Sequence, residues 1–121
     1  IADMKIRRGD IYYTRLEDVS QAVGSEQSGS RPAVVIQNDI GNKYSPTTIV
    51  AFITTKPKHG LPTHVRLHTN KLFFSSIAML EQIRTISKDR LDRYIGTLDE
   101  AEMKKIDRAL CISLNINEKE N

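Results

Sequence analysis

The sequence has no tryptophan, a single cysteine and no apolar run long enough to cross a membrane. Cys111 cannot form an internal disulfide, which favours a reducing compartment. A membrane-spanning helix needs about 20 mainly apolar residues, so no membrane partner is expected. The N-terminus also lacks the charged and then apolar pattern of a signal peptide. We therefore expect a cytoplasmic protein.

Motifs for nucleotides, dinucleotides and metals are missing as well. The chain contains no P-loop, no G-x-G-x-x-G, no zinc-spaced cysteines and no H-E-x-x-H. His59, His64 and His68 are close in sequence, but on a strand His64 and His68 would stand about 13 Å apart, too far to share a metal ion. The sequence therefore predicts no metal site.

Acidic residues are absent between Ile40 and Leu80, although the whole chain has 15 of them and a net charge of only +3. The same segment carries five basic residues, which are Lys43, Lys56, Lys58, Arg66 and Lys71, and all three histidines. A surface that binds a polyanion needs such a composition, because basic residues release counterions from phosphates. Strands also disfavour Asp and Glu, so nucleic-acid binding and plain strand composition both remain open on charge alone.

The predicted elements are mostly short strands. A chain of 121 residues is expected to be one domain over residues 1–121, with a core of about 5–114 and a polar tail at 115–121. Strands are predicted at 10–16, 33–37, 48–53, 64–67, 73–79, 80–86 and 94–98. We expect turn chemistry at 38–42, with Ser45 and Pro46 starting the next strand, and a short helix at 87–93.

A longer helix is predicted at the C-terminal end. Asp99 and Glu102 have the spacing of an N-cap box, and Met103, Ile106, Leu110 and Leu114 follow at helical spacing. Together the elements predict a mainly β fold with a C-terminal α-helix, a small SH3-like barrel.

A loop rich in Ser, Gln and Gly at 17–30 leads to Arg31 and to two apolar strands. Long loops in compact domains chiefly serve binding or catalysis. The residue before a proline is pushed into extended backbone, and Pro32 suits the first position of a strand. The backbone of Arg31 is therefore expected to be restricted to an extended conformation. An ion pair of Arg31 with Glu26 or Asp39 that closes the loop is equally compatible with the sequence.

Six segments in order resemble the MazF/PemK (Kid) toxin family, over Lys5 to about Leu114. They are R-G-D-I-Y at 8–12, G-S-E-Q-S-G-S-R-P at 24–32, V-I-Q-N-D at 35–39, S-P-T at 45–47, L-P-T-H-V at 61–65 and E-Q-I-R-T-I at 81–86. The resemblance implies a CcdB/MazF-type barrel that forms a homodimer and cuts single-stranded RNA without a metal or cofactor. It also implies a MazE/PemI-like antitoxin as partner.

The resemblance assigns catalytic roles to Arg31, directly before the proline, and to Thr54, at the end of the strand T-I-V-A-F-I-T. An arginine offers a planar fork of charged donors that matches a phosphate. The hydroxyl of Thr54 could hydrogen-bond the scissile phosphate, a role for which Thr55 competes. Strand alternation predicts that Thr54 shares a face with Phe52 and Val50, away from Thr55.

Substrate contacts are expected from polar side chains of the loop and of the E-Q-I-R strand, because RNA is mostly read on unpaired bases. The candidates are Ser25, Glu26, Gln27, Lys56, His64, Gln82 and Arg84. Glu81, Gln82 and Arg84 would fit a dimer rim or an exposed strand face nearly as well. Lys56 fits a solvated turn charge, and His64 is a candidate for the acid step.

The predicted function is that of a toxin that cuts mRNA at a short sequence, independently of the ribosome. Attack by the 2′-hydroxyl would leave a 2′,3′-cyclic phosphate and a 5′-hydroxyl. One alternative is a gyrase poison like CcdB, which relies on a tryptophan-bearing tail that this chain lacks; another is a passive RNA-binding barrel. The loop reads G-S-E-Q-S-G where the family usually has G-S-E-Q-G-G, and the segment before it is longer, which leaves the base preference open.

Overall fold

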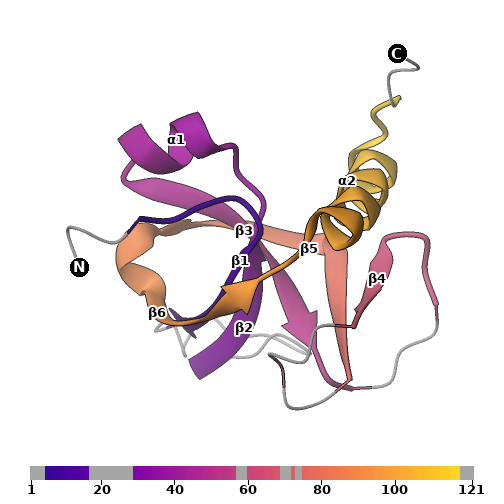
Figure 1. Ribbon diagram of the computed structural model, residues 1–121, viewed down its shortest axis with the longest axis horizontal. Helices are drawn as coiled ribbons and strands as arrows, with labels where there is room; N and C mark the ends of the chain where they lie inside the picture. The colour runs from indigo at the N-terminus through magenta and orange to yellow at the C-terminus, as the bar shows by residue number, and fades with distance from the viewer. Residues whose placement is uncertain (1–4, 17–28, 57–59, 69–71, 73–74, 118–121) are drawn as a thin grey trace.

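The computed structural model describes residues 5–16, 29–56, 60–68, 72 and 75–117. Its centre is one antiparallel sheet of six strands, with the spatial order β4-β5-β3-β2-β1-β6. The strands are β1 (Asp10–Leu16), β2 (Gly29–Val35), β3 (Thr47–Thr54), β4 (His64–Leu67), β5 (Ser76–Ser87) and β6 (Leu91–Thr97). Two short helices, α1 (Asp39–Tyr44) and η2 (Lys88–Arg90), join strands, and α2 (Glu100–Leu114) follows the last strand. Figure 1 shows the curled sheet with α2 beside β4 and β5.

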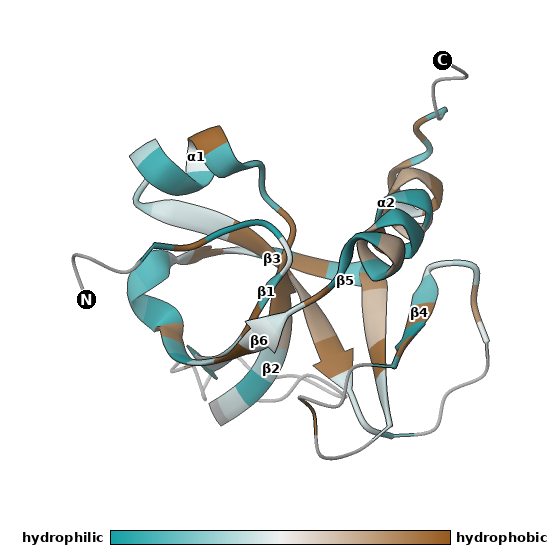
Figure 2. Ribbon diagram, viewed as in Figure 1, coloured by the Kyte–Doolittle hydropathy of each residue, from teal (hydrophilic) through white to brown (hydrophobic). Residues whose placement is uncertain are grey.

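Alternation along the strands divides the apolar side chains into two clusters, one on each side of the sheet. One cluster lies beneath α2, where the strand residues Ala51, Ile53 and Val65 pack with Ile106 and Ala109 of the helix. We call the other face the inner face. Its buried residues are Ile6, Tyr12, Leu16, Ala33, Val35, Val50, Phe52, Ile77, Met79, Ile86 and Leu91. Figure 2 shows the hydrophobic colour concentrated on β3 and β5, whereas α2 alternates between hydrophobic and hydrophilic residues.

Capping hydrogen bonds close both ends of α2. The Asp99 carboxylate accepts from the Glu102 backbone N–H at 2.8 Å, which confirms the predicted N-cap. Asn115 closes the helix in the left-handed conformation with φ 58°.

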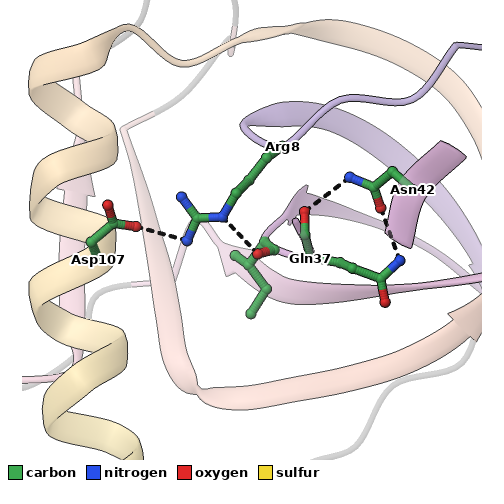
Figure 3. Close-up of polar contacts among 5 residues, drawn as sticks. Arg8, Gln37, Asn42 and Asp107 are labelled. Carbon is green, nitrogen blue, oxygen red and sulfur yellow. Dashed lines mark hydrogen bonds and ion pairs between the residues drawn. The ribbon is translucent and has the colours of Figure 1, made fainter. Parts of the chain in front are cut away.

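Arg8 links α2 to the segment that follows β2. Its Nε donates to the Ile36 carbonyl at 2.8 Å, and its Nη2 donates to Asp107 of α2 at 2.7 Å (Figure 3). None of the helices in the described part of the chain is long and apolar enough to span a membrane.

The predicted turn at 38–42 is wrong, because these residues begin α1. Asn38 caps the helix by accepting from the Gly41 backbone N–H at 2.7 Å, so the Asn and Asp that suggested a turn serve as helix-starting residues. The next strand begins at Thr47 rather than at Ser45. Figure 3 shows Asn42 of α1 bonded twice to Gln37: its side-chain nitrogen donates to the Gln37 backbone carbonyl, and its side-chain oxygen accepts from the Gln37 side-chain nitrogen.

From Ser76 onward the predicted strands at 73–79 and 80–86 are one strand, β5, so six strands are described rather than seven. Phe73 and Phe74 lie outside the described residues. Ala51 pairs with Ile83 but Ile53 pairs with Ala78, which shows a break in register near the middle of β5. A bulge of this kind bends a strand without ending it. The predicted helix at 87–93 is only the 3-10 turn Lys88–Arg90, and Leu91 already belongs to β6.

The start of β2 also differs from the prediction. Gly29 and Ser30 belong to the strand instead of the loop, and Pro32 is its fourth residue rather than its first. The ladder from β2 to β3 begins only at Ala33, directly after the proline, which has no backbone N–H to donate. Proline is tolerated here because it stands where one side of the strand is still unpaired.

Candidate active site

Arg31 and Thr54 come together where β2 begins and β3 ends. The two strands pair antiparallel through Ala33 with Phe52, Val34 with Ala51 and Val35 with Val50. The ladder ends at Ala33 and Phe52, and extending its register by two residues places Arg31 across from Thr54 on the same face of the two strands. Both residues point to the inner face, since Ala33 and Phe52, two positions further along each strand, belong to its cluster.

The guanidinium of Arg31 packs on an aromatic ring rather than on a carboxylate. Its Cζ lies 4.5 Å from the centroid of the Phe52 ring. Partial burial lowers the pKa of Arg31 below its ordinary value, although an arginine stays charged at neutral pH. Among the described residues it has no ion-pair partner. Asp39 binds the Arg8 backbone N–H instead, so the alternative of an Arg31–Asp39 pair is wrong.

The hydroxyl of Thr54 lies at the strand end, half-buried, and accepts a hydrogen bond from the Lys56 backbone N–H at 3.1 Å. Val50 and Phe52 lie in the inner cluster and Ile53 in the cluster beneath α2, so the predicted face of Thr54 is confirmed. Thr55 is exposed. The Oγ1–H proton of Thr54 therefore remains available for a ligand oxygen.

Thr14 belongs to the site although no motif in the sequence singles it out. It is fully buried on β1, opposite Arg31, and its hydroxyl donates to the Arg31 carbonyl at 3.0 Å. That bond holds the backbone of Arg31 from the neighbouring strand β1. The only available signal is a threonine in the polar position of the strand I-Y-Y-T-R-L.

His64 lies at the start of β4 and is bound to β5. Its Nε2 is 2.9 Å from Glu81 Oε2, and the Thr63 hydroxyl donates to Glu81 Oε1 at 2.8 Å. Burial of Glu81 favours its neutral form, but the hydrogen bonds from Thr63 and His64 outweigh burial and lower the pKa of the carboxyl. The side chain of His64 is only 9% exposed, and its buried Nδ1 has no hydrogen-bond partner in the described structure.

The other predicted substrate residues are distributed along β3 and β5. Lys56 is exposed two residues after Thr54, and Gln82 is exposed at the register break of β5. Arg84 pairs with Val50, four residues or about 13 Å along β3 from Thr54. The arginine is therefore separated from the Arg31–Thr54 pair along the strand. Ser25, Glu26 and Gln27 lie outside the described residues.

The geometry supplies donors for a developing negative charge at one edge of the inner face. Arg31 brings a permanently charged fork, and Thr54 brings a hydroxyl from the neighbouring strand. Phe52 and Ile77 make the floor beneath them apolar, and a low-dielectric floor strengthens the attraction between a cation and a phosphate. Within the part of the chain that the structure describes, no three His, Cys, Asp or Glu residues gather as metal ligands would. The arrangement of Arg31 and Thr54 fits binding of a phosphate.

Comparisons with known proteins point to one family. Residues 7–114 match the family model of the PemK-like, MazF-like toxin of type II toxin-antitoxin systems. The Endoribonuclease EndoA of Bacillus subtilis (strain 168) is 53% identical over 114 residues, which cover 92% of this chain and 96% of that protein.

Solved structures show the same fold. A mycobacterial endoribonuclease in complex with its cognate antitoxin has a TM-score of 0.78 at 24% identity, covering 94% of this chain and 99% of the other. MazF from Deinococcus radiodurans has a TM-score of 0.77 at 20% identity, covering 94% and 100%. The predicted family and the predicted mainly β fold are both confirmed. The chain belongs to the PemK-like, MazF-like toxins of type II toxin-antitoxin systems.

Proposed function

We propose that this toxin cleaves single-stranded mRNA at a short recognised sequence, without a metal, a cofactor or the ribosome. The toxin is an endoribonuclease, as its family and its 53% identity to EndoA indicate. The observation that carries the proposal is the cross-strand placement of Arg31 and Thr54 over an apolar floor. The site combines the two kinds of donor that a phosphorane needs.

In the proposed reaction the 2′-hydroxyl of the substrate attacks the adjacent phosphorus, and the bond to the 5′-oxygen of the next nucleotide breaks. The 2′-hydroxyl loses its proton to water and the departing 5′-oxygen takes a proton from water, so the products are a 2′,3′-cyclic phosphate and a 5′-hydroxyl. Arg31 binds the non-bridging oxygens, whose negative charge increases in the transition state. Thr54 donates a hydrogen bond from its hydroxyl to one of these oxygens. Neither side chain titrates near neutral pH, so both act as charge stabilisers.

Other predicted residues surround this centre. Lys56 is close enough in sequence to Thr54 to contact the RNA backbone, and Gln82 and Arg84 offer polar groups on β5. Ser25, Glu26 and Gln27 remain proposed base contacts. His64 is less suited to donate the leaving-group proton, because its Nε2 is engaged by Glu81 and its Nδ1 is buried. We assign it to positioning Glu81.

We further propose a homodimer in the cytoplasm, inhibited by a MazE/PemI-like antitoxin. The structural relatives include an endoribonuclease in complex with its cognate antitoxin and MazE–MazF complexes. An acidic or amphipathic antitoxin segment that covered Arg31 would neutralise the cation on which cleavage depends.

The test is cleavage of a long single-stranded RNA in EDTA by the wild-type chain, Arg31→Ala and Thr54→Ala, with mapping of the fragment ends. Discrete cuts with cyclic phosphate ends, abolished by both substitutions, are expected. Thr55→Ala is the matched control and should cut normally, because Thr55 points away from the inner face.

Activity of Arg31→Ala or Thr54→Ala at the wild-type rate would contradict the assignment of these residues. Binding of RNA without cutting by a folded wild-type protein would favour the passive RNA-binding barrel. Inhibition of gyrase without RNA cleavage would favour the CcdB-like alternative.

A further inference from the structure

We propose that Arg66 binds the RNA phosphate that neighbours the scissile one, as a second cationic subsite. This inference rests on the proposed function and adds a residue that neither the motifs nor the comparisons single out. Arg66 is the exposed third residue of β4, between buried Val65 and Leu67.

Strand pairing sets Arg66 in line with the catalytic pair. Thr54 of β3 pairs with Ile77 of β5, and Ile77 in turn pairs with Arg66 of β4. With Arg31 opposite Thr54, one row across the sheet contains Arg31, Thr54, Ile77 and Arg66. Val65 and Leu67 pack toward α2, so alternation turns Arg66 to the inner face together with Ile77.

Spacing and chemistry fit a bound strand of RNA. Two strand steps separate Thr54 from Arg66, which is about 10 Å between backbones, and the long arginine side chain shortens the gap. Ile77 is only 8% exposed and lies between the two polar positions, where it offers an apolar floor for a ribose or a base. Arg31 and Arg66 would each bind one phosphate, and the apolar Ile77 between them would lie under the sugar or base that joins the two phosphates.

The surroundings of Arg66 leave its charge available. It has no ion-pair partner among the described residues, and Glu81, the acidic side chain on this part of β5, is bound by Thr63 and His64. Because β4 is an edge strand, Arg66 also borders a groove toward α2 that is lined by Lys105 and Arg108. Lys105 is therefore the matched control, because Lys105→Ala also removes one positive charge, but from the groove toward α2 and not from the inner face.

The experiment measures binding of an RNA oligonucleotide that contains the mapped cut site, made uncleavable by a single 2′-deoxy sugar. We expect Arg66→Ala to raise Kd roughly tenfold, as the loss of one charged hydrogen-bonded contact does. The slope of log affinity against log salt should become shallower by about 0.7, the value for one phosphate of a single strand. Lys105→Ala should change neither quantity.

A methylphosphonate linkage placed at one position at a time identifies the phosphate. An uncharged linkage next to the cut site should weaken binding by the wild type but not by Arg66→Ala. If Arg66→Ala and Lys105→Ala bind alike while the wild type cuts normally, the subsite is overturned and the proposed nuclease stands. If the wild type neither binds nor cuts RNA, both proposals are overturned.

Discussion

At the scale of single residues, the site depends on one arginine whose position is fixed from two sides. Phe52 supports the guanidinium of Arg31 from below, and Thr14 holds its backbone carbonyl from the neighbouring strand. Substitutions can therefore separate the positioning of Arg31 from the effect of its positive charge.

Replacement of Arg31 by lysine should lower kcat by at least about 100-fold, because an ammonium cannot offer the planar fork that spans two phosphate oxygens. The charge is kept, so RNA affinity should fall much less than the rate. Single-turnover cleavage and binding of an uncleavable RNA measure the two effects. Arg93→Lys is the control, since Arg93 also stacks on a ring, that of Tyr13 at 4.9 Å, but lies on β6. Near-normal cleavage by Arg31→Lys would show that charge alone suffices.

Replacement of Thr14 by valine keeps the shape but removes the hydrogen bond to the Arg31 carbonyl. The lost hydrogen bond should cost about 1 kcal/mol of stability, and kcat should fall roughly tenfold as Arg31 shifts. Thr14→Ser retains the hydroxyl and should restore kcat even if its lost methyl group lowers the melting temperature. A folded Thr14→Val enzyme with unchanged kcat would remove Thr14 from the positioning of Arg31.

At the scale of elements, β4 is joined to the bend of β5 by the carboxylate of Glu81. Both of its oxygens are bound, one by Thr63 and one by His64, across the start of β4. The edge strand that carries Arg66 is short, with four residues, so side-chain bonds of this kind help to fix it. The lowered pKa of Glu81 makes this contribution depend on pH.

The pKa of Glu81 is lower in the folded chain than in the unfolded chain, so its contribution to stability is present above the unfolded value, near 4.5. The contribution is lost as the pH falls through the folded pKa. The difference in free energy of unfolding between wild type and Glu81→Gln should therefore shrink below about pH 4.5. Denaturant unfolding at several pH values measures it, with exposed Asp92→Asn as the control. A difference that is the same at pH 3 and pH 7 would contradict the role of the charged carboxylate.

At the scale of the whole molecule, Lys43 and Lys56 of the acid-free segment 40–80 do not share one basic surface, because they lie near opposite ends of β3. Lys43 lies on α1, next to the start of β3, whereas Lys56 follows the end of β3 (Figure 1). The seven residue steps from Thr47 to Thr54 correspond to roughly 23 Å. RNA bound at the Arg31–Thr54 end should therefore contact only part of this charge.

The salt dependence of RNA binding should distinguish the two lysines. Lys56→Ala should make the slope of log affinity against log salt shallower by about 0.7, and Lys43→Ala should leave it unchanged. Titration of an uncleavable RNA at several salt concentrations measures both slopes. Equal losses for the two variants would mean that RNA contacts the protein near both ends of β3.

The sequence by itself determined the family, the mainly β class and the local elements with strong periodicity or caps. Strand 10–16, strand 64–67 and the N-cap at Asp99 are as predicted, because alternation and capping are local properties of the chain. The face of Thr54 was predictable for the same reason. The continuous β5 was not, since a bulge depends on the strands that pair with each half.

Only the tertiary structure decided which side chains meet. Arg31, Thr14 and Thr54 lie on three strands, and register, a property of pairs of strands, brings them into one row. Register is set by burial of one face and by ladder contacts between distant segments, neither of which is visible in a single strand. The same pairing of distant strands placed Arg66 in one row with Thr54, a proposed catalytic residue, and placed Lys43 near the other end of β3.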